Sequence, residues 1–187
     1  MMRYTGTNTW FKGNTHIHSR ASDGGLTVRQ LARRYAARGY DFLVRTDHWA
    51  ASDVCAEKAE APLLWLDGME LDGTDTAGAY YHIVCIGIFA GIRREMGLIP
   101  ALESCRAQNG WTVLAHPFWT GNSAEDVRRW PFDAVEIYNH VCQWLNGKGS
   151  GLVQWQQALA RRPQTMALAV DDAHITPDHP GWDGGWV

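Results

Sequence analysis

The chain has 187 residues and a formal net charge of −3, and hydrophobic residues make up 45% of it. This length predicts one domain over residues 1–187 with a buried core. The small net charge argues against a nucleic-acid partner, and no apolar run approaches the roughly 18 residues that span a bilayer. The four cysteines show no paired spacing, so we expect a soluble, unprocessed protein of the cytoplasm.

Short apolar runs predict seven strands, and amphipathic segments between most of them predict helices. In chain order the predicted elements are a strand at 12–18, a helix at 26–38 with Thr27 as its cap, strands at 41–47, 62–71 and 81–89, a helix at 93–108, a strand at 111–116, a helix at 123–130, a strand at 133–138, a helix at 151–161 and a strand at 166–172. Alternation of this kind predicts an α/β fold with a mainly parallel sheet.

The connection between Glu70 and His82 breaks this alternation. Only eleven residues separate the two, and several of them are turn-forming Asp, Gly and Thr. A hairpin-like return would leave His82, at the start of its strand, beside Glu70 at the end of the preceding one.

Residues 14–23 carry the strongest chemical signal in the chain. His16 and His18 are two residues apart, so on a strand their imidazoles point to the same face. The segment that follows is rich in turn formers and can bring Asp23 back over the strand end. Imidazole and carboxylate ligands together suit Zn, Mn or Fe better than Ca or Mg.

Other His, Asp and Glu side chains stand where predicted strands end. They are His48 after 41–47, Glu70 in 62–71, His116 after 111–116, and Asp172 and His174 after 166–172. Residues 172 and 174 share a face as 16 and 18 do, so Asp172 is preferred over Asp171, which should point away. In barrels of alternating strands and helices, the rim formed by these strand ends is where active sites are built.

These motifs, in this order, resemble those of the PHP family, which is named for polymerase and histidinol phosphatase. The matching segments are His16-Ile17-His18-Ser19 with Ser22-Asp23-Gly24, Thr46-Asp47-His48, Gly68-Met69-Glu70 with His82-Ile83-Val84, Ala115-His116-Pro117, and Asp172-Ala173-His174. The resemblance runs from about residue 12 to residue 174. It implies a distorted (β/α)7 barrel, a TIM-like PHP fold, here without the helix that usually follows the last strand.

The resemblance also implies a centre of two or three divalent metal ions, Zn, Mn or Fe. Carried over by motif, His16, His18, Glu70 and Asp172 hold one metal; Glu70, His82 and His116 hold a second; Asp23, His48 and His174 hold a third. Glu70 is then the bridge. Glu136 ends the strand at 133–138 at the same rim, where either a hydrogen bond to a ligand or an incidental position fits the sequence.

The expected activity is that of a phosphoesterase that hydrolyses a phosphate ester of a small metabolite or nucleotide with a metal-activated hydroxide. His174 or His82 is the candidate for protonating the leaving group, and Arg20 or Lys148 for holding the phosphate. One alternative is hydrolysis of a non-phosphate ester, amide or carbamate, because tryptophans such as Trp119 near the motifs predict an apolar pocket. A second alternative is a non-catalytic, metal-stabilised module.

The segment after the last predicted strand is rich in Pro, Gly and Trp and has no helical period. Without a helix, the outer face of that strand, with Ala167 and Ala169, needs another cover. We expect either a homodimer or residues 177–187 folded back across the strand by Trp182 and Trp186.

Overall fold

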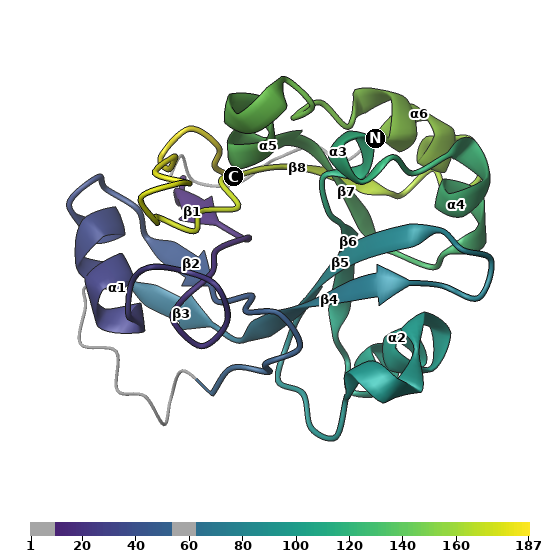
Figure 1. The fold of residues 1–187 in the computed structure, drawn as a ribbon, viewed down its shortest axis with the longest axis horizontal. Coiled ribbons are helices and arrows are strands. Elements are labelled where there is room, and N and C mark those ends of the chain that lie inside the picture. The colour runs from purple at the N-terminus through teal and green to yellow at the C-terminus, as the bar shows by residue number, and fades with distance from the viewer. Residues whose placement is uncertain (1–9, 54–62) are drawn as a thin grey trace.

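The computed structural model describes residues 10–53 and 63–187 (Figure 1). The strands in these residues are β1 Gly13–Asn14, β2 Phe42–Val44, β3 Leu64–Leu66, β4 Gly68–Thr74, β5 Tyr80–Ile86, β6 Trp111–Leu114, β7 Ala134–Asn139 and β8 Met166–Val170. The helices are α1 Val28–Ala36, α2 Leu98–Ala107, α3 Pro117–Thr120, α4 Ala124–Arg129, α5 His140–Asn146 and α6 Leu152–Leu159, and a 3₁₀ turn spans Arg94–Met96.

The strands form two sheets, and the expected barrel of seven strands is not confirmed. One sheet has the order β1-β2-β3 and is parallel, and the other has the order β4-β5-β6-β7-β8. Single bridges join their edges, between Ile17 and Ala173 on one side and between His48 and Glu70 on the other. Among the described residues no closed barrel forms, although both sheets contribute to one rim.

The strand expected at 62–71 breaks at Asp67, which explains the extra strand. Before the break, β3 pairs in parallel with β2; after it, β4 pairs antiparallel with β5. Ser52, from a distant part of the sequence, stabilises the break. Its hydroxyl donates to Asp67 Oδ1 at 2.7 Å and accepts the Gly68 N–H at 2.9 Å. One predicted strand therefore serves two sheets.

The hairpin-like return between Glu70 and His82 is confirmed. In the β4–β5 ladder Asp72 lies opposite His82. Asp75 shapes the turn, because its Oδ1 accepts the N–H groups of Ala77 and Ala79, both at 2.9 Å. Gly78, with φ of 83°, supplies the left-handed conformation that this turn needs.

Two of the predicted helices begin at capping boxes. Thr27 forms a capping box with Gln30 at the start of α1, as expected, and Ser123 forms one with Asp126 at the start of α4. The structure also has two short helices that the sequence patterns did not indicate, α3 and α5. The side chain of Asn139 caps α5 by accepting the Cys142 N–H at 2.9 Å.

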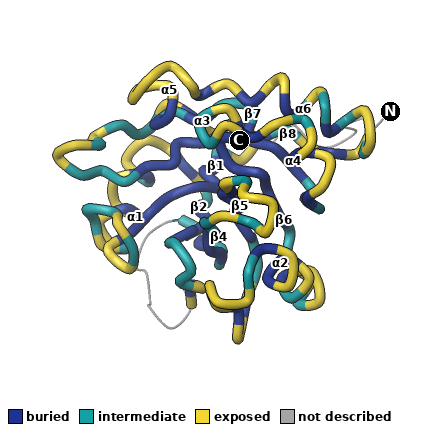
Figure 2. Tube along the Cα trace, turned by 45° about the vertical axis from the view of Figure 1, so that its right-hand side comes forward, coloured by how far each residue is buried: buried dark blue, intermediate teal, exposed yellow. Residues whose placement is uncertain are grey.

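The buried residues lie on both faces of the strands, and exposed helical faces surround them (Figure 2). One cluster packs between the larger sheet and α2, α4 and α6, a second lies around α1 and the smaller sheet, and a third includes Val84, Val113 and Val170. Cys85 and Cys105 place their sulfurs 3.2 Å apart in the first cluster, a contact that sequence spacing did not indicate.

Residues 171–187 contain no helix and fold back over the junction of β1 and β8. Gly13 and Val187 exchange backbone hydrogen bonds at 2.9 and 3.0 Å. Trp182 packs edge-on against Tyr35 of α1, with ring centroids 5.3 Å apart, whereas Trp186 is 55% exposed. The segment folds back on the molecule, but Trp182 packs on α1 and not on the outer face of β8, so the expected cover of Ala167 and Ala169, by this segment or by a second copy of the chain, stays a prediction.

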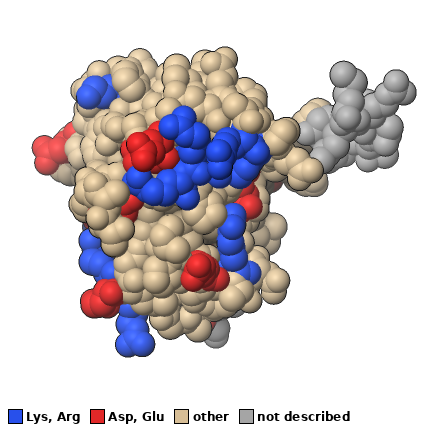
Figure 3. Space-filling model, turned by 90° about the vertical axis from the view of Figure 1, so that its right-hand side faces the viewer, with Lys and Arg blue, Asp and Glu red and all other residues tan. Residues whose placement is uncertain are grey.

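Basic side chains gather in a band on the side that carries α4 and α6 (Figure 3). Arg106 and Arg162 line a shallow hollow there, beside Asp133 at the start of β7. No helix in the described residues is long and apolar enough to cross a membrane.

Candidate metal centre

His16 and His18 lie in the segment that follows β1 and are fully buried. The expected parity holds, because Ile17 between them packs in the cluster around α1 while both imidazoles point the other way. Their Nε2 atoms are 3.1 Å apart. Two imidazole nitrogens therefore converge on one point at the rim.

Glu70 stands at the centre of the converging side chains. Its Oε2 lies 3.3 Å from the Nε2 atoms of both His16 and His18, and its Oε1 lies 2.8 Å from His82 Nδ1 and 3.4 Å from His116 Nε2. Because β4 ends one sheet and touches the other through the bridge to His48, a residue on β4 can reach both halves of the rim.

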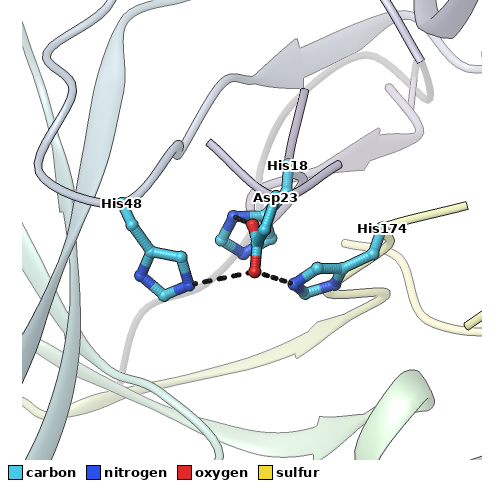
Figure 4. Close-up of side chains that lie close together, drawn as sticks. All are labelled: His18, Asp23, His48 and His174. Carbon is cyan, nitrogen blue, oxygen red and sulfur yellow. Dashed lines mark ion pairs between the residues drawn. The ribbon is translucent and has the colours of Figure 1, made fainter. Parts of the chain in front are cut away.

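Asp23 gathers a second group at the mouth of the site. Its Oδ2 is 3.2 Å from His174 Nε2 and 3.7 Å from His48 Nε2, and its Oδ1 is 3.4 Å from His18 Nδ1 (Figure 4). The turn after His18 returns the carboxylate to the rim, since the Gly24 N–H donates to the Ser19 carbonyl at 2.9 Å. The structure thus brings Asp23 where the spacing predicted.

Asp172 and His116 share an unusual backbone conformation. Their φ angles are 57° and 26°, in a region that non-glycine residues rarely occupy. Such conformations cost on the order of 1–3 kcal/mol each and persist where the surroundings hold them, most often at functional sites. Asp172 Oδ1 reaches the Nε2 atoms of His16 and His18 at 3.2 Å each.

All nine side chains predicted as metal ligands lie in one cluster. They form four overlapping groups whose ligand atoms lie within 4.8 Å of one another: His18, Asp23, His48 and His174; His16, Glu70 and His116; His16, His18 and Asp172; and His48, Glu70 and His82. We call this set the nine-residue cluster. Its composition of imidazoles and carboxylates suits Zn, Mn or Fe.

Glu136 on β7 orients the buried end of the cluster. His16 Nδ1 donates to Glu136 Oε1 at 2.6 Å, and Glu136 Oε2 accepts the His116 N–H at 2.8 Å and the Asn139 amide at 3.0 Å. Holding His16 through Nδ1 directs its Nε2 toward Glu70. The sequence left open whether Glu136 makes a hydrogen bond to a predicted ligand or lies at the rim incidentally. The structure has the hydrogen bond, to His16.

The carboxylates raise the pKa of four imidazoles of the cluster, those of His16, His18, His48 and His116. Burial lowers the pKa of His18, but its close contacts with the carboxylates of Asp172 and Glu70 outweigh this effect and raise the pKa to about 9. Burial raises the pKa of Asp172, yet the charges of His16 and its other neighbours bring it well below its usual range. The site thus favours positive charge, which protons supply when no cation is bound.

Three buried atoms of the cluster make no contact with hydrogen-bond geometry among the described residues. They are His48 Nδ1, His82 Nε2 and Asp172 Oδ1, although His48 Nδ1 and Asp172 Oδ1 lie close to groups of opposite polarity. A buried polar atom without a hydrogen bond costs about 1–3 kcal/mol, so each such atom calls for an explanation. All three are ligand atoms on side chains of the nine-residue cluster, so a divalent metal fits the residues that are present.

A cavity of about 230 Å³ opens beside the nine-residue cluster. Arg20 does not line it: its Nε donates to the Gly25 carbonyl at 2.9 Å, and it faces a separate surface hollow. Lys148 is exposed and does not line the cavity either. In the described part of the chain, no Lys or Arg lines the cavity, so the structure brings neither expected cation to it.

Sequence reasoning missed two polar residues of the site. Asp72 lies 3.1 Å from His48 Nδ1, and its position two residues after Glu70 on one strand was a usable signal. His179 lines the cavity and meets His174 at a ring distance of 5.8 Å. No motif marks His179, because the fold of residues 171–187 brings it there.

Comparison with known proteins gives one sequence relative, and no family model matches the chain. The chain is 26% identical over 132 residues to the DNA polymerase/3'-5' exonuclease PolX of Bacillus subtilis. The match covers 57% of this chain and spans only 23% of the length of PolX.

Solved structures resemble the whole fold. A two-domain protein from Bacteroides vulgatus, containing a predicted PHP-like metal-dependent phosphoesterase, has a TM-score of 0.62 at 19% identity and covers 88% of this chain and 52% of its own. A protein from Bifidobacterium adolescentis, described as a "putative metal-dependent phosphoesterase", has a TM-score of 0.65 at 15% identity; the match covers 88% of this chain and 89% of that protein. An amidohydrolase from Chromobacterium violaceum, with bound sulfate and no metal, has a TM-score of 0.59 at 18% identity, covering 91% and 90%. The resemblance that the motifs predict is therefore confirmed: the chain has the fold of PHP-like metal-dependent phosphoesterases.

Proposed function

We propose that the protein is a metal-dependent hydrolase that cleaves phosphate esters of small molecules. The observation that carries this proposal is the convergence of nine imidazole and carboxylate side chains beside one cavity. The similarity to structures named as phosphoesterases supports the choice of phosphate as substrate.

The nine-residue cluster offers positions for two or three divalent ions. Glu70 would hold two of these ions, because its two oxygens face different histidines, with Oε2 toward His16 and His18 and Oε1 toward His82 and His116. Asp23, His48 and His174 form the outermost group (Figure 4). Bound divalent ions would supply a nucleophile at neutral pH by lowering the pKa of water and would stabilise charge on the phosphate oxygens.

The remaining residues position these groups and handle the proton. Glu136 fixes His16, and the Thr120 hydroxyl lies 3.0 Å from His116 Nδ1, which leaves His116 Nε2 to face Glu70. His82 and His174 both line the cavity and are the candidates for giving a proton to the leaving group.

A second candidate is hydrolysis of a non-phosphate ester, amide or carbamate. The cavity is lined on one side by Trp119, Val141 and Leu145, and among the described residues it has no Lys or Arg to hold a phosphate. A neutral substrate would need no such cation.

The test is turnover of para-nitrophenyl phosphate against para-nitrophenyl acetate by samples of measured metal content. We expect phosphate turnover that chelation abolishes and that Mn or Zn restores. Acetate turnover alone would favour the second candidate, and bound metal without either activity would indicate a metal-stabilised, non-catalytic module. Undiminished turnover by protein shown to be metal-free would overturn the proposal.

A further inference from the structure

The cavity beside the nine-residue cluster has a second side that is apolar. Helix α3 contributes Trp119, and helix α5 contributes Val141, Cys142 and Leu145. At about 230 Å³ the cavity is smaller than the roughly 300–1,000 Å³ typical of sites for drug-sized ligands. It therefore suits a small organic group next to the reacting centre.

Trp119 is continuous with the cluster. Helix α3 begins directly after His116, and the indole meets the rings of His116 and His82 at 5.2 and 5.8 Å, each at 83°. These edge contacts hold the ring in one orientation. If the reacting phosphorus of a substrate lies next to Glu70, His82 and His116, the organic group attached to it lies beside the indole.

The α5 side is tied to the same cluster by Asn139. This side chain caps α5 and also donates to Asp172 Oδ2 at 3.2 Å. Val141 and Cys142 are buried, while Leu145 is 39% exposed at the mouth. Cys142 is buried and adds its side chain to the apolar wall of the cavity.

We propose that the cleft between Trp119 and α5 binds the leaving group of the substrate, and that this group is flat, apolar and uncharged, such as an arylalkyl alcohol or a phenol. The inference rests on the proposed function for the reacting end of the substrate. A sugar or a second phosphate on the leaving group would meet apolar side chains and, in the described residues, no Lys or Arg.

The experiment compares two esters that differ by one phenyl group but have alcohols of similar basicity, 2-phenylethyl phosphate and ethyl phosphate. The non-hydrolysable 2-phenylethylphosphonate and ethylphosphonate give the same comparison for binding to metal-loaded protein, by calorimetry. Burial of a phenyl group predicts a preference on the order of tenfold or more in kcat/KM and in Kd.

One variant tests each wall of the cleft, and a control variant changes another residue of α5. Trp119→Ala and Leu145→Ser should each reduce the phenyl preference to about threefold or less, because each removes apolar surface from the cleft. Leu145 lies at the mouth, so its variant tests the cleft without removing a side chain packed against His82 or His116. Trp144→Ala removes a residue of α5 that is 53% exposed and does not line the cavity, and it should leave the preference unchanged.

The outcomes separate the cleft from the reaction. If no phosphate ester is hydrolysed but the phosphonates show the phenyl preference and both variants remove it, the cleft stands and the phosphoesterase proposal fails. If the two phosphates are hydrolysed equally well and the two phosphonates bind equally, the reaction stands and the cleft is wrong. Failure of 2-phenylethylphosphonate to bind, or a phenyl preference that survives both variants, would also overturn the inference.

Discussion

The two ends of the larger sheet carry opposite chemistry. At the ends of β6 and β8 stand His116 and Asp172, two residues of the nine-residue cluster, and among the described residues no Lys or Arg lines the cavity beside it. At the starts of β6, β7 and β8, Arg106 and Arg162 line a hollow beside Asp133. The net charge of −3 gives no sign of these two oppositely charged regions. The local arrangement of charges, and not their sum, therefore indicates where a cation binds.

The largest expected effect comes from replacing Glu70, whose two carboxylate oxygens contact different histidines, His16 after β1 and His82 on β5. Glu70→Ala should lose close to two metals per chain and lower turnover by more than about 10³-fold, beyond the about 10–100-fold that loss of a residue supporting a ligand costs. His48→Ala should lose at most one metal. Elemental analysis and kinetics on the same samples measure both, and equal metal losses in the two variants would show that Glu70 is not the bridge.

Asp171 should matter for stability and not for metal binding, although it adjoins Asp172. It accepts hydrogen bonds from Tyr35 Oη at 2.7 Å and from the N–H groups of residues 183, 184 and 185 at 2.8 Å each. Asp171→Ala leaves these donors unpaired and should lower the free energy of unfolding by about 3 kcal/mol, measured in urea. Unchanged metal content is the accompanying expectation, and loss of metal from a folded variant would contradict the division between the two neighbours.

Glu136 should have an intermediate effect, because it acts through His16 and His116. Glu136→Gln keeps the shape of the side chain but weakens its hold on His16, so metal affinity or turnover should fall about 10–100-fold. Titration of the chelated protein with Zn²⁺ measures the change. If the variant binds Zn²⁺ as tightly as the unaltered protein, Glu136 does not support metal binding.

As the pH rises, the Tm of the metal-free protein should fall, whereas the increase in Tm that Zn²⁺ causes should become larger. His18 has a pKa of about 9 in the fold and about 6.5 when unfolded, so its protonated form stabilises the fold fully below pH 6.5. That stabilisation is lost as the pH rises through 9, so the Tm of chelated protein should fall over this range. Metal needs neutral imidazole, so the shift in Tm caused by Zn²⁺ should grow instead. If the increase in Tm that Zn²⁺ causes becomes smaller as the pH rises, this prediction is wrong.

The smallest effect belongs to the opposite end of the sheet. Arg162 donates to the Val127 carbonyl at 2.8 Å and lies over the Phe132 ring at 4.2 Å, far along the strands from the cluster. Arg162→Ala should leave metal content and kcat/KM unchanged within about twofold, since its contacts are confined to that end. A large loss of turnover with an unchanged Tm would show that the two ends are coupled.

Local rules predicted much of the site and less of the fold. Alternation along a strand was enough to pair His16 with His18 and to separate Asp171 from Asp172. Long-range packing decided the rest: the break at Asp67 depends on Ser52, and Glu136 became a partner of His16 only once β7 lay near β1. His179 and the wall from α5 depend in the same way on how distant segments meet, which no short motif encodes.

The most direct test of the metal centre is anomalous diffraction from crystals of the Mn²⁺-loaded protein. We predict anomalous peaks inside the nine-residue cluster, at least one of them within about 2.0–2.2 Å of a Glu70 oxygen and of an imidazole nitrogen. Peaks only at other places on the molecule, or none in crystals that contain Mn²⁺, would contradict the claim that these residues form a metal centre.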